Sequence, residues 1–209
     1  MNLNLKALIG NIILFILEVI GLIICITLTK GLDLKYYTNW SNILGLLSSL
    51  FFIINYFIKE RNNIFNLVVK YLRLTSTICL TVTLCVVLFI FVPFDHFNFY
   101  RWAIEGKFFS FHFFSPIVSI ISFVFFERYD FKYIKDTSIG MIFTIIYSIV
   151  ISILILTKSI PAPYPFLEYY NHSVIINILT VLVMLLIILG WTILYIFIKK
   201  KMFKNIKDS

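Results

Sequence analysis

Residues 7–29 read ALIGNIILFILEVIGLIICITLT, an apolar run of 23 residues that carries one charged side chain, Glu18. At a helical rise of about 1.5 Å per residue, a run of this length crosses a hydrocarbon core of about 30 Å. Five runs of similar length follow, at 41–58, 71–92, 108–126, 138–157 and 175–198. The sequence therefore predicts an all-α, polytopic membrane protein in which residues 1–209 form one bundle of six transmembrane helices.

The composition excludes a water-soluble globule. Hydrophobic residues make up 61% of the 209-residue chain and charged residues 13%, which leaves too little polar surface for a soluble protein of this size. Backbone groups in lipid must be paired within a helix or around a closed barrel, and runs this long and uninterrupted favour helices. The first run is too long for the apolar part of a signal peptide, so we expect the N-terminal helix to be retained.

The basic residues predict the orientation. With the N-terminus inside, 13 of the 18 Lys and Arg residues fall on the inner side and five in the opposite loops: Lys30, Lys35, Arg101, Lys107 and Lys158. By the positive-inside rule both termini are expected to be cytoplasmic. The net charge of +8 is concentrated beside helix ends and in the tail at 199–207, without a separate basic domain. This pattern favours membrane lipids over nucleic acid as partners.

The chemistry-bearing side chains gather on the opposite, outer side. All three histidines (His96, His112 and His172) and the polar stretch YYTNWSN at 36–42 fall there. No glycine-rich phosphate motif, HExxH or nucleophile elbow occurs, and no pair of histidines has the HxH or HxxxH spacing of a metal site. The pattern thus predicts a site at the outer face and no metal, cofactor or particular oligomeric state.

Polar side chains recur at helical spacing within two of the runs. One stripe holds His112, Ser115, Ser119 and Ser122, and the other holds Thr38, Asn42, Gly45 and Ser49. Each set lies along one helix face, so we expect the two stripes to face each other. The alternative is ordinary packing, because small and hydroxylated residues commonly join membrane helices.

Two of these residues admit both a functional and a structural interpretation. Thr38 or its neighbour Asn39 can cap the second helix, or the Thr38 hydroxyl can react. The His112 imidazole can pair with a backbone carbonyl, or it can serve as a general base or acid in an outer cavity.

Two charged side chains, Glu18 and Arg73, lie within the apolar runs. Glu18 is near mid-membrane, where a charge is costly, so we expect it to be protonated, hydrogen-bonded across helices or beside water. It would also suit an ion or small-molecule transporter. Arg73, at the inner end of the third run, is expected to snorkel to the membrane surface.

Four short motifs, taken in order, resemble a known family. They are YTNWSNIL at 37–44, TVT at 81–83, HFFSP at 112–116 and YPFLE at 164–168. Together they are similar to the androgen-induced-gene and androgen-dependent tissue-factor-inhibitor-regulating membrane proteins, and most of all to their bacterial integral-membrane relatives. The resemblance implies a six-span protein of the bacterial plasma membrane. It also implies a hydrolase of fatty acid esters of hydroxy fatty acids that uses a threonine and a histidine.

The positions that match the family's threonine and histidine are Thr38 and His112. In this interpretation Thr38 is the nucleophile and His112 the base for a fatty acyl ester substrate. The amide hydrogens that begin the second helix, with Asn39 or Asn42, would hold the developing negative charge. Glu168 is expected to orient His112. Tyr164 and Glu18 complete the residues expected to contact substrate. A transporter and a non-catalytic structural or interaction protein remain the alternatives.

Overall fold

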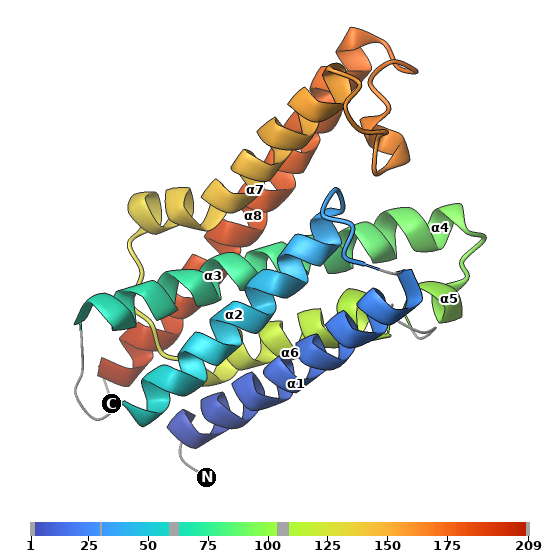
Figure 1. Ribbon diagram of the computed structural model, residues 1–209. Helices are drawn as coiled ribbons and strands as arrows, with labels where there is room; N and C mark the ends of the chain where they lie inside the picture. Colours follow the sequence, from blue (N-terminus) through green and yellow to red (C-terminus); the bar gives the residue numbers. More distant parts are fainter. Residues whose placement is uncertain (1–2, 30, 59–62, 104–108, 208–209) are drawn as a thin grey trace.

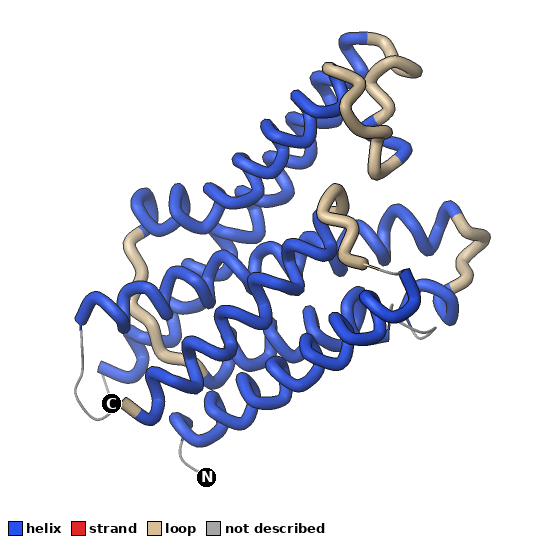
Figure 2. The backbone as a smooth tube through the Cα atoms, in the orientation of Figure 1, coloured by secondary structure: helices blue, strands red, loops and turns tan. Residues whose placement is uncertain are grey.

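The computed structural model describes residues 3–29, 31–58, 63–103 and 109–207, which contain helices and loops but no strand (Figure 2). The α-helices are α1 (Leu3–Thr29), α2 (Tyr37–Phe57), α3 (Asn63–Val86), α4 (Val92–Phe94), α5 (Phe99–Ala103), α6 (Ser115–Ile121), α7 (Tyr133–Leu156) and α8 (Val174–Lys207). Three π-helical turns, η1 (Val87–Phe91), η2 (Phe109–Phe114) and η3 (Ser122–Phe126), continue α3 or flank α6, and η4 (Pro165–Leu167) is a short 3₁₀ helix. The all-α class is confirmed.

Five helices in the described ranges are long and apolar enough to cross a membrane: Leu3–Leu28, Tyr37–Phe57, Asn63–Phe94, Tyr133–Leu156 and Val174–Met202. They correspond to five of the six predicted runs. The remaining run, 108–126, is a shorter apolar helix over Phe111–Phe126, and its first residue lies outside the described residues. Spans of this length and composition make the chain a polytopic integral membrane protein.

The distribution of side chains is the reverse of that in a soluble protein. Large apolar side chains are exposed along the helices, including Ile16 and Ile20 of α1 and Ile146 and Ile153 of α7. The interior instead contains many polar side chains. Such a surface is stable only in contact with lipid tails, and hydrogen bonds between the buried polar groups join the helices.

The helices form two groups that share α3 (Figure 1). Helices α1, α2, α3 and α6 pack together, while α7 and α8 pair with each other and lie against α3. Both chain termini lie at one end of the molecule (Figure 1), which is called the termini end here. The opposite end, called the far end, carries α4, α5 and the loop between α7 and α8.

One expectation about a charged side chain is wrong. Arg73 does not snorkel: it is fully buried and forms an ion pair with Glu127, 2.7 Å from Nη2 to Oε1. The reason is that the chain leaves η3 directly beside α3, so that Glu127 supplies an opposite charge inside the bundle. A paired guanidinium has no need to reach the membrane surface.

Candidate functional site

A cavity of about 640 Å³ opens at the far end, and it is called the far-end cavity. Its wall comes from six parts of the chain: α1, the segment that enters α2, η1, α5, η2 and the loop after α7. The lining residues are Cys25, Asp33, Tyr36, Thr38, Asn39, Phe91, Trp102, Phe111, His112, Pro163, Tyr164 and Pro165. Four residues that the sequence singled out therefore share one cavity: Thr38, Asn39, His112 and Tyr164.

Thr38 lies in the first turn of α2 and does not cap it. The helix begins at Tyr37, and the residue before it, Tyr36, makes no side-chain capping bond, so the predicted cap at Thr38 or Asn39 is wrong. The carbonyl oxygen of Thr38 accepts two hydrogen bonds, from Ser41 Oγ at 2.9 Å and Asn42 Nδ2 at 2.6 Å. These bonds hold the first turn and leave the Thr38 side chain at the cavity wall.

Tyr164 lies over the start of α2. Its side chain is buried, and its hydroxyl lies beside the Thr38 hydroxyl and the backbone amides of Tyr37 and Thr38. Burial raises the pKa of Tyr164, while the nearby Thr38 hydroxyl and amides act in the opposite direction. A neutral phenol therefore meets the N-terminus of α2, whose first amide hydrogens have no partner within the helix.

His112 is buried in the π-helical turn η2, on the cavity wall. Its ring stacks on Trp102 with centroids 6.4 Å apart and an interplanar angle of 14°. Trp102 in turn stacks on Phe91 and donates from Nε1 to Asp95 Oδ2 at 2.9 Å. The imidazole is thus held by an aromatic stack in a π-turn, a distortion of helices that is frequent at functional sites.

The two asparagines use their amide hydrogens to hold the backbone. Asn39 Nδ2 donates to Asp33 O at 2.8 Å, and Asn42 Nδ2 donates to the Thr38 carbonyl. Asn39 lines the far-end cavity, whereas the fully buried Asn42 is not part of the lining. Both side chains therefore support the turn that presents Thr38.

The two predicted carboxylates lie elsewhere. Glu168 is exposed, accepts a hydrogen bond from Asn171 at 2.7 Å and does not line the far-end cavity. Glu18 is fully buried in α1 and also does not line the cavity.

The two predicted stripes meet at the far end, where Thr38 and His112 line one cavity, whereas two serines further along the His112 stripe bond other segments. Ser119 of α6 bonds Thr77 of α3 at 3.0 Å, while Ser122 donates to Glu127 at 3.0 Å. On α2, two serines outside the predicted stripe bond α3: Ser41 with Thr83 at 2.9 Å and Ser48 with Ser76 at 2.7 Å. The cause is the central position of α3, which presents hydroxyl groups to both neighbours.

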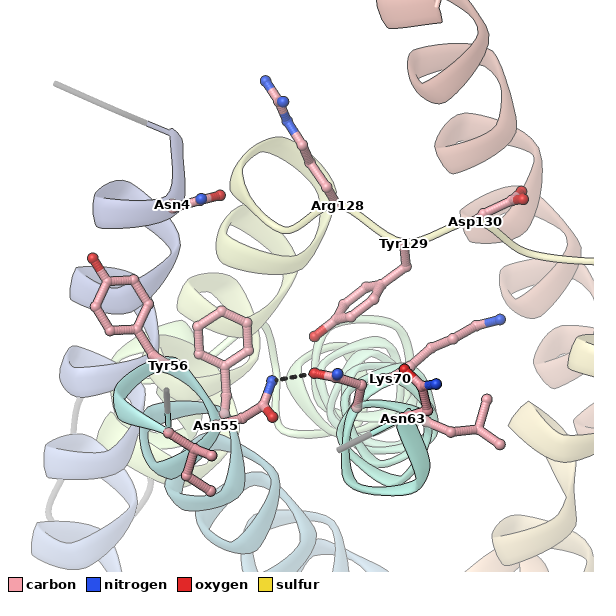
Figure 3. A pocket seen from close by; sticks show the side chains of 12 residues that line it. Asn4, Asn55, Tyr56, Asn63, Lys70, Arg128, Tyr129 and Asp130 are labelled. Carbon is pink, nitrogen blue, oxygen red and sulfur yellow. Dashed lines mark hydrogen bonds between the residues drawn. The ribbon is translucent and has the colours of Figure 1, made fainter. Parts of the chain in front are cut away.

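A second pocket, of about 580 Å³, lies at the termini end (Figure 3). Four asparagines are among its lining residues, and Asn55 Nδ2 donates to Asn66 Oδ1 at 2.9 Å. The nearby ammonium of Lys70 is held by Asp136 at 3.1 Å. Sequence analysis did not identify this pocket, although Asn55, Asn63 and Asn66 cluster where α2 ends and α3 begins.

Among the residues that the structure describes, no three His, Cys, Asp or Glu side chains gather as metal ligands. Comparison of the chain with protein-family models, curated proteins and solved structures finds no match.

Proposed function

We propose that this protein hydrolyses a lipid ester in the far-end cavity, with Thr38 as the nucleophile and His112 as the general base. The observation that carries the proposal is that both side chains line one cavity of about 640 Å³. The resemblance to threonine-dependent lipid hydrolases supports it. In this proposal the chain crosses a bacterial plasma membrane six times and has both termini in the cytoplasm. The far-end cavity then faces the outer side of the membrane.

The reaction is a two-step acyl transfer. The Thr38 oxygen bonds to the ester carbonyl carbon while its proton passes to His112. The ester carbon–oxygen bond then breaks, and the departing alkoxide takes the proton from His112 and leaves as the alcohol. Water, activated by His112, hydrolyses the acyl-Thr38 ester, releases the fatty acid and restores the hydroxyl.

The negative charge that develops on the carbonyl oxygen needs hydrogen-bond donors. The backbone N–H groups of Tyr37 and Thr38 begin α2 and point along the positive end of its dipole. The Tyr164 hydroxyl lies beside them, and its burial keeps the phenol neutral, so that it can donate. We therefore assign this role to the two amides and Tyr164, which lie beside the Thr38 hydroxyl.

The aromatic side chains of the cavity wall suit the binding of a substrate with an apolar acyl chain. Phe91, Trp102 and Phe111 present rings to the space near His112, and a cavity of about 300–1,000 Å³ with few polar groups is typical of small-molecule sites. Membrane lipids are the nearest source of such esters. An oxidant, metal or cofactor is not required by this chemistry.

The test is hydrolysis of a long-chain fluorogenic acyl ester by the purified protein in nanodiscs. Thr38→Ala and His112→Gln are each expected to lower kcat by about 10³-fold or more. Thr38→Ser keeps a hydroxyl group and should retain part of the activity. A fluorophosphonate should label Thr38, as located by peptide mass spectrometry.

Two exposed residues provide matched controls, since Thr157→Ala and His172→Gln change the same residue types away from the cavity. Both control variants should hydrolyse the ester at the wild-type rate. Full activity in Thr38→Ala would contradict the proposal. Wild-type protein without turnover or labelling would favour the non-catalytic interaction protein instead.

A further inference from the structure

Glu18 lies at the centre of the four-helix group formed by α1, α2, α3 and α6. Its carboxyl group packs directly on the backbone of α2, because a Cβ added to Gly45 would lie 2.5 Å from Glu18 Oε1. Leu80 of α3 lies 3.2 Å from the same Cβ position. Ser115 of α6 lies beside the carboxyl group but does not form a hydrogen bond of normal geometry with it. Three helices therefore meet the Glu18 side chain from α1.

Four oxygen atoms at this level lack a hydrogen-bond partner among the described residues: both carboxyl oxygens of Glu18, Ser115 Oγ and Asn42 Oδ1. All three side chains are fully buried. Asn42 precedes Gly45 by one helical turn and so lies on the same face of α2. Buried polar atoms without partners are destabilising, and a ligand that all four oxygens can approach removes this cost.

No described basic side chain forms an ion pair with Glu18. Arg73 is held by Glu127, and Lys199 donates to two carbonyl groups. That charged group lies about two turns from Glu18 towards the termini end, since Asn11, two turns before Glu18, bonds Glu127. On the α6 side the nearest titratable group is His112, one turn before Ser115. A carboxylate here requires a cation or a proton.

We infer that Glu18, Asn42 and Ser115 form a binding site for Na⁺, with a proton on Glu18 as its competitor. Carboxylate, amide carbonyl and hydroxyl oxygens are hard ligands suited to small hard cations. A monovalent ion neutralises the single carboxylate. A proton would supply only one donor and pair with one further oxygen, whereas Na⁺ can contact all four.

The site lies one turn below the far-end cavity on two helices. Asn42 follows the cavity residue Thr38 by four residues on α2, and Ser115 follows His112 by three. The far-end cavity is therefore the direction from which an ion reaches Glu18. The inference does not depend on the proposed hydrolysis, because the site contains neither of its two reacting side chains.

The test compares the thermal unfolding midpoint of detergent-purified protein in NaCl and in choline chloride at equal ionic strength. At neutral pH, Na⁺ should raise the midpoint of the wild type in a saturable manner, and the effect should shrink in acid as protons compete. Glu18→Gln should abolish the response to Na⁺. Glu168→Gln, at an exposed carboxylate, should keep it.

A second pair of variants decides the question if Glu18→Gln does not fold. Gly45→Ala displaces the Glu18 carboxyl group and should weaken the Na⁺ response, whereas Gly190→Ala, with no atom within 4 Å of its new Cβ, should leave it intact. Equal midpoints of the wild type in both salts would overturn the inference. A Na⁺ response that survives Glu18→Gln would overturn it as well, and so would stabilisation by acid in a protein that shows no response to Na⁺ at neutral pH.

Discussion

Arg73 and Glu127 form an ion pair in which neither side chain is exposed to solvent. The Arg73 Nη2 lies 2.7 Å from Glu127 Oε1, and Nε lies 3.0 and 3.1 Å from the two carboxylate oxygens. Asn11 Nδ2 and Ser122 Oγ each donate to Oε1 at 3.0 Å. The pair thereby ties α1, α3 and the chain beyond η3 together, with hydrogen bonds that compensate the removal of both charges from water.

Loss of either charge should strongly destabilise the fold. Glu127→Gln or Arg73→Met leaves the other charge buried without a partner, which typically costs about 3–5 kcal/mol. The free energy of unfolding in mixed detergent, measured with increasing denaturant, gives the change. The exposed Arg128→Gln is the control and should fall within about 0.5 kcal/mol of the wild type. Comparable losses in the control and the pair variants would contradict the assignment.

The same pair predicts a loss of stability in acid. Burial by itself raises the pKa of Glu127, but Arg73, with Asn11 and Lys199, outweighs it, so that the pKa lies below its ordinary value of 4.5. A depressed pKa means that the unfolded chain binds the proton first. The contribution is therefore complete at neutral pH and declines as the pH falls from about 4.5 towards the folded-state pKa.

Unfolding midpoints measured from neutral to acid pH test this dependence. The wild-type midpoint should fall steeply at the acid end, and the profile of Glu127→Gln should be flatter because it has no carboxyl group to titrate there. Asp130→Asn, at an exposed carboxylate, should keep the wild-type slope. Parallel profiles for the wild type and Glu127→Gln would show that another group causes the decline.

Substitution of Lys199 should destabilise the fold much more than substitution of Lys201, although both lysines lie in the basic C-terminal part of α8. Lys199 is buried and donates to Val124 O at 3.0 Å and to Glu127 O at 2.6 Å, whereas Lys201 is exposed. Lys199→Met leaves two carbonyl groups at the end of η3 without their donor, at a cost of about 1–3 kcal/mol. Lys201→Met should be nearly neutral. The thermal unfolding midpoints of the two variants in detergent measure this difference. Equal midpoints would contradict the stabilising role of the hydrogen bonds from Lys199 to the two carbonyl groups.

The apolar runs predicted the long helices because hydrophobic length alone determines what can cross lipid. The same reasoning failed for Arg73. An arginine at a helix end has the same local sequence whether it snorkels or pairs internally, and its partner Glu127 lies far along the chain. Contacts between distant segments depend on how the helices pack together, and the sequence periodicity of a single helix does not predict that packing.

The sequence also predicted the positions of some residues of the candidate site but not of others. Thr38 and His112 were expected on one side of the membrane, and both line the far-end cavity. Glu168, the last residue of the YPFLE motif, was expected to orient His112. The 3₁₀ turn at Pro165–Leu167 intervenes, so that Tyr164 is buried while Glu168 is exposed. One tight turn thus places two residues of the same short motif in different surroundings.

The Tyr164 hydroxyl should matter more to the proposed hydrolysis than to binding of the ester. Tyr164→Phe keeps the buried ring but removes a donor beside the first amides of α2, where the oxyanion is proposed to form. Loss of one such donor typically lowers kcat by about 10²–10³-fold with a small change in KM. Steady-state kinetics with the fluorogenic ester measure both constants.

Tyr170→Phe is the matched control, since Tyr170 is exposed and its hydroxyl donates to the carbonyl of Leu156 outside the cavity. Its kcat should equal that of the wild type. The unfolding midpoint of Tyr164→Phe must also be measured, because the same hydroxyl lies beside the first amides of α2. A raised KM at unchanged kcat would place Tyr164 in substrate binding. A lowered midpoint that accounts for all lost activity would make its role structural, and the negative charge would then have to be held by the amides of Tyr37 and Thr38 alone.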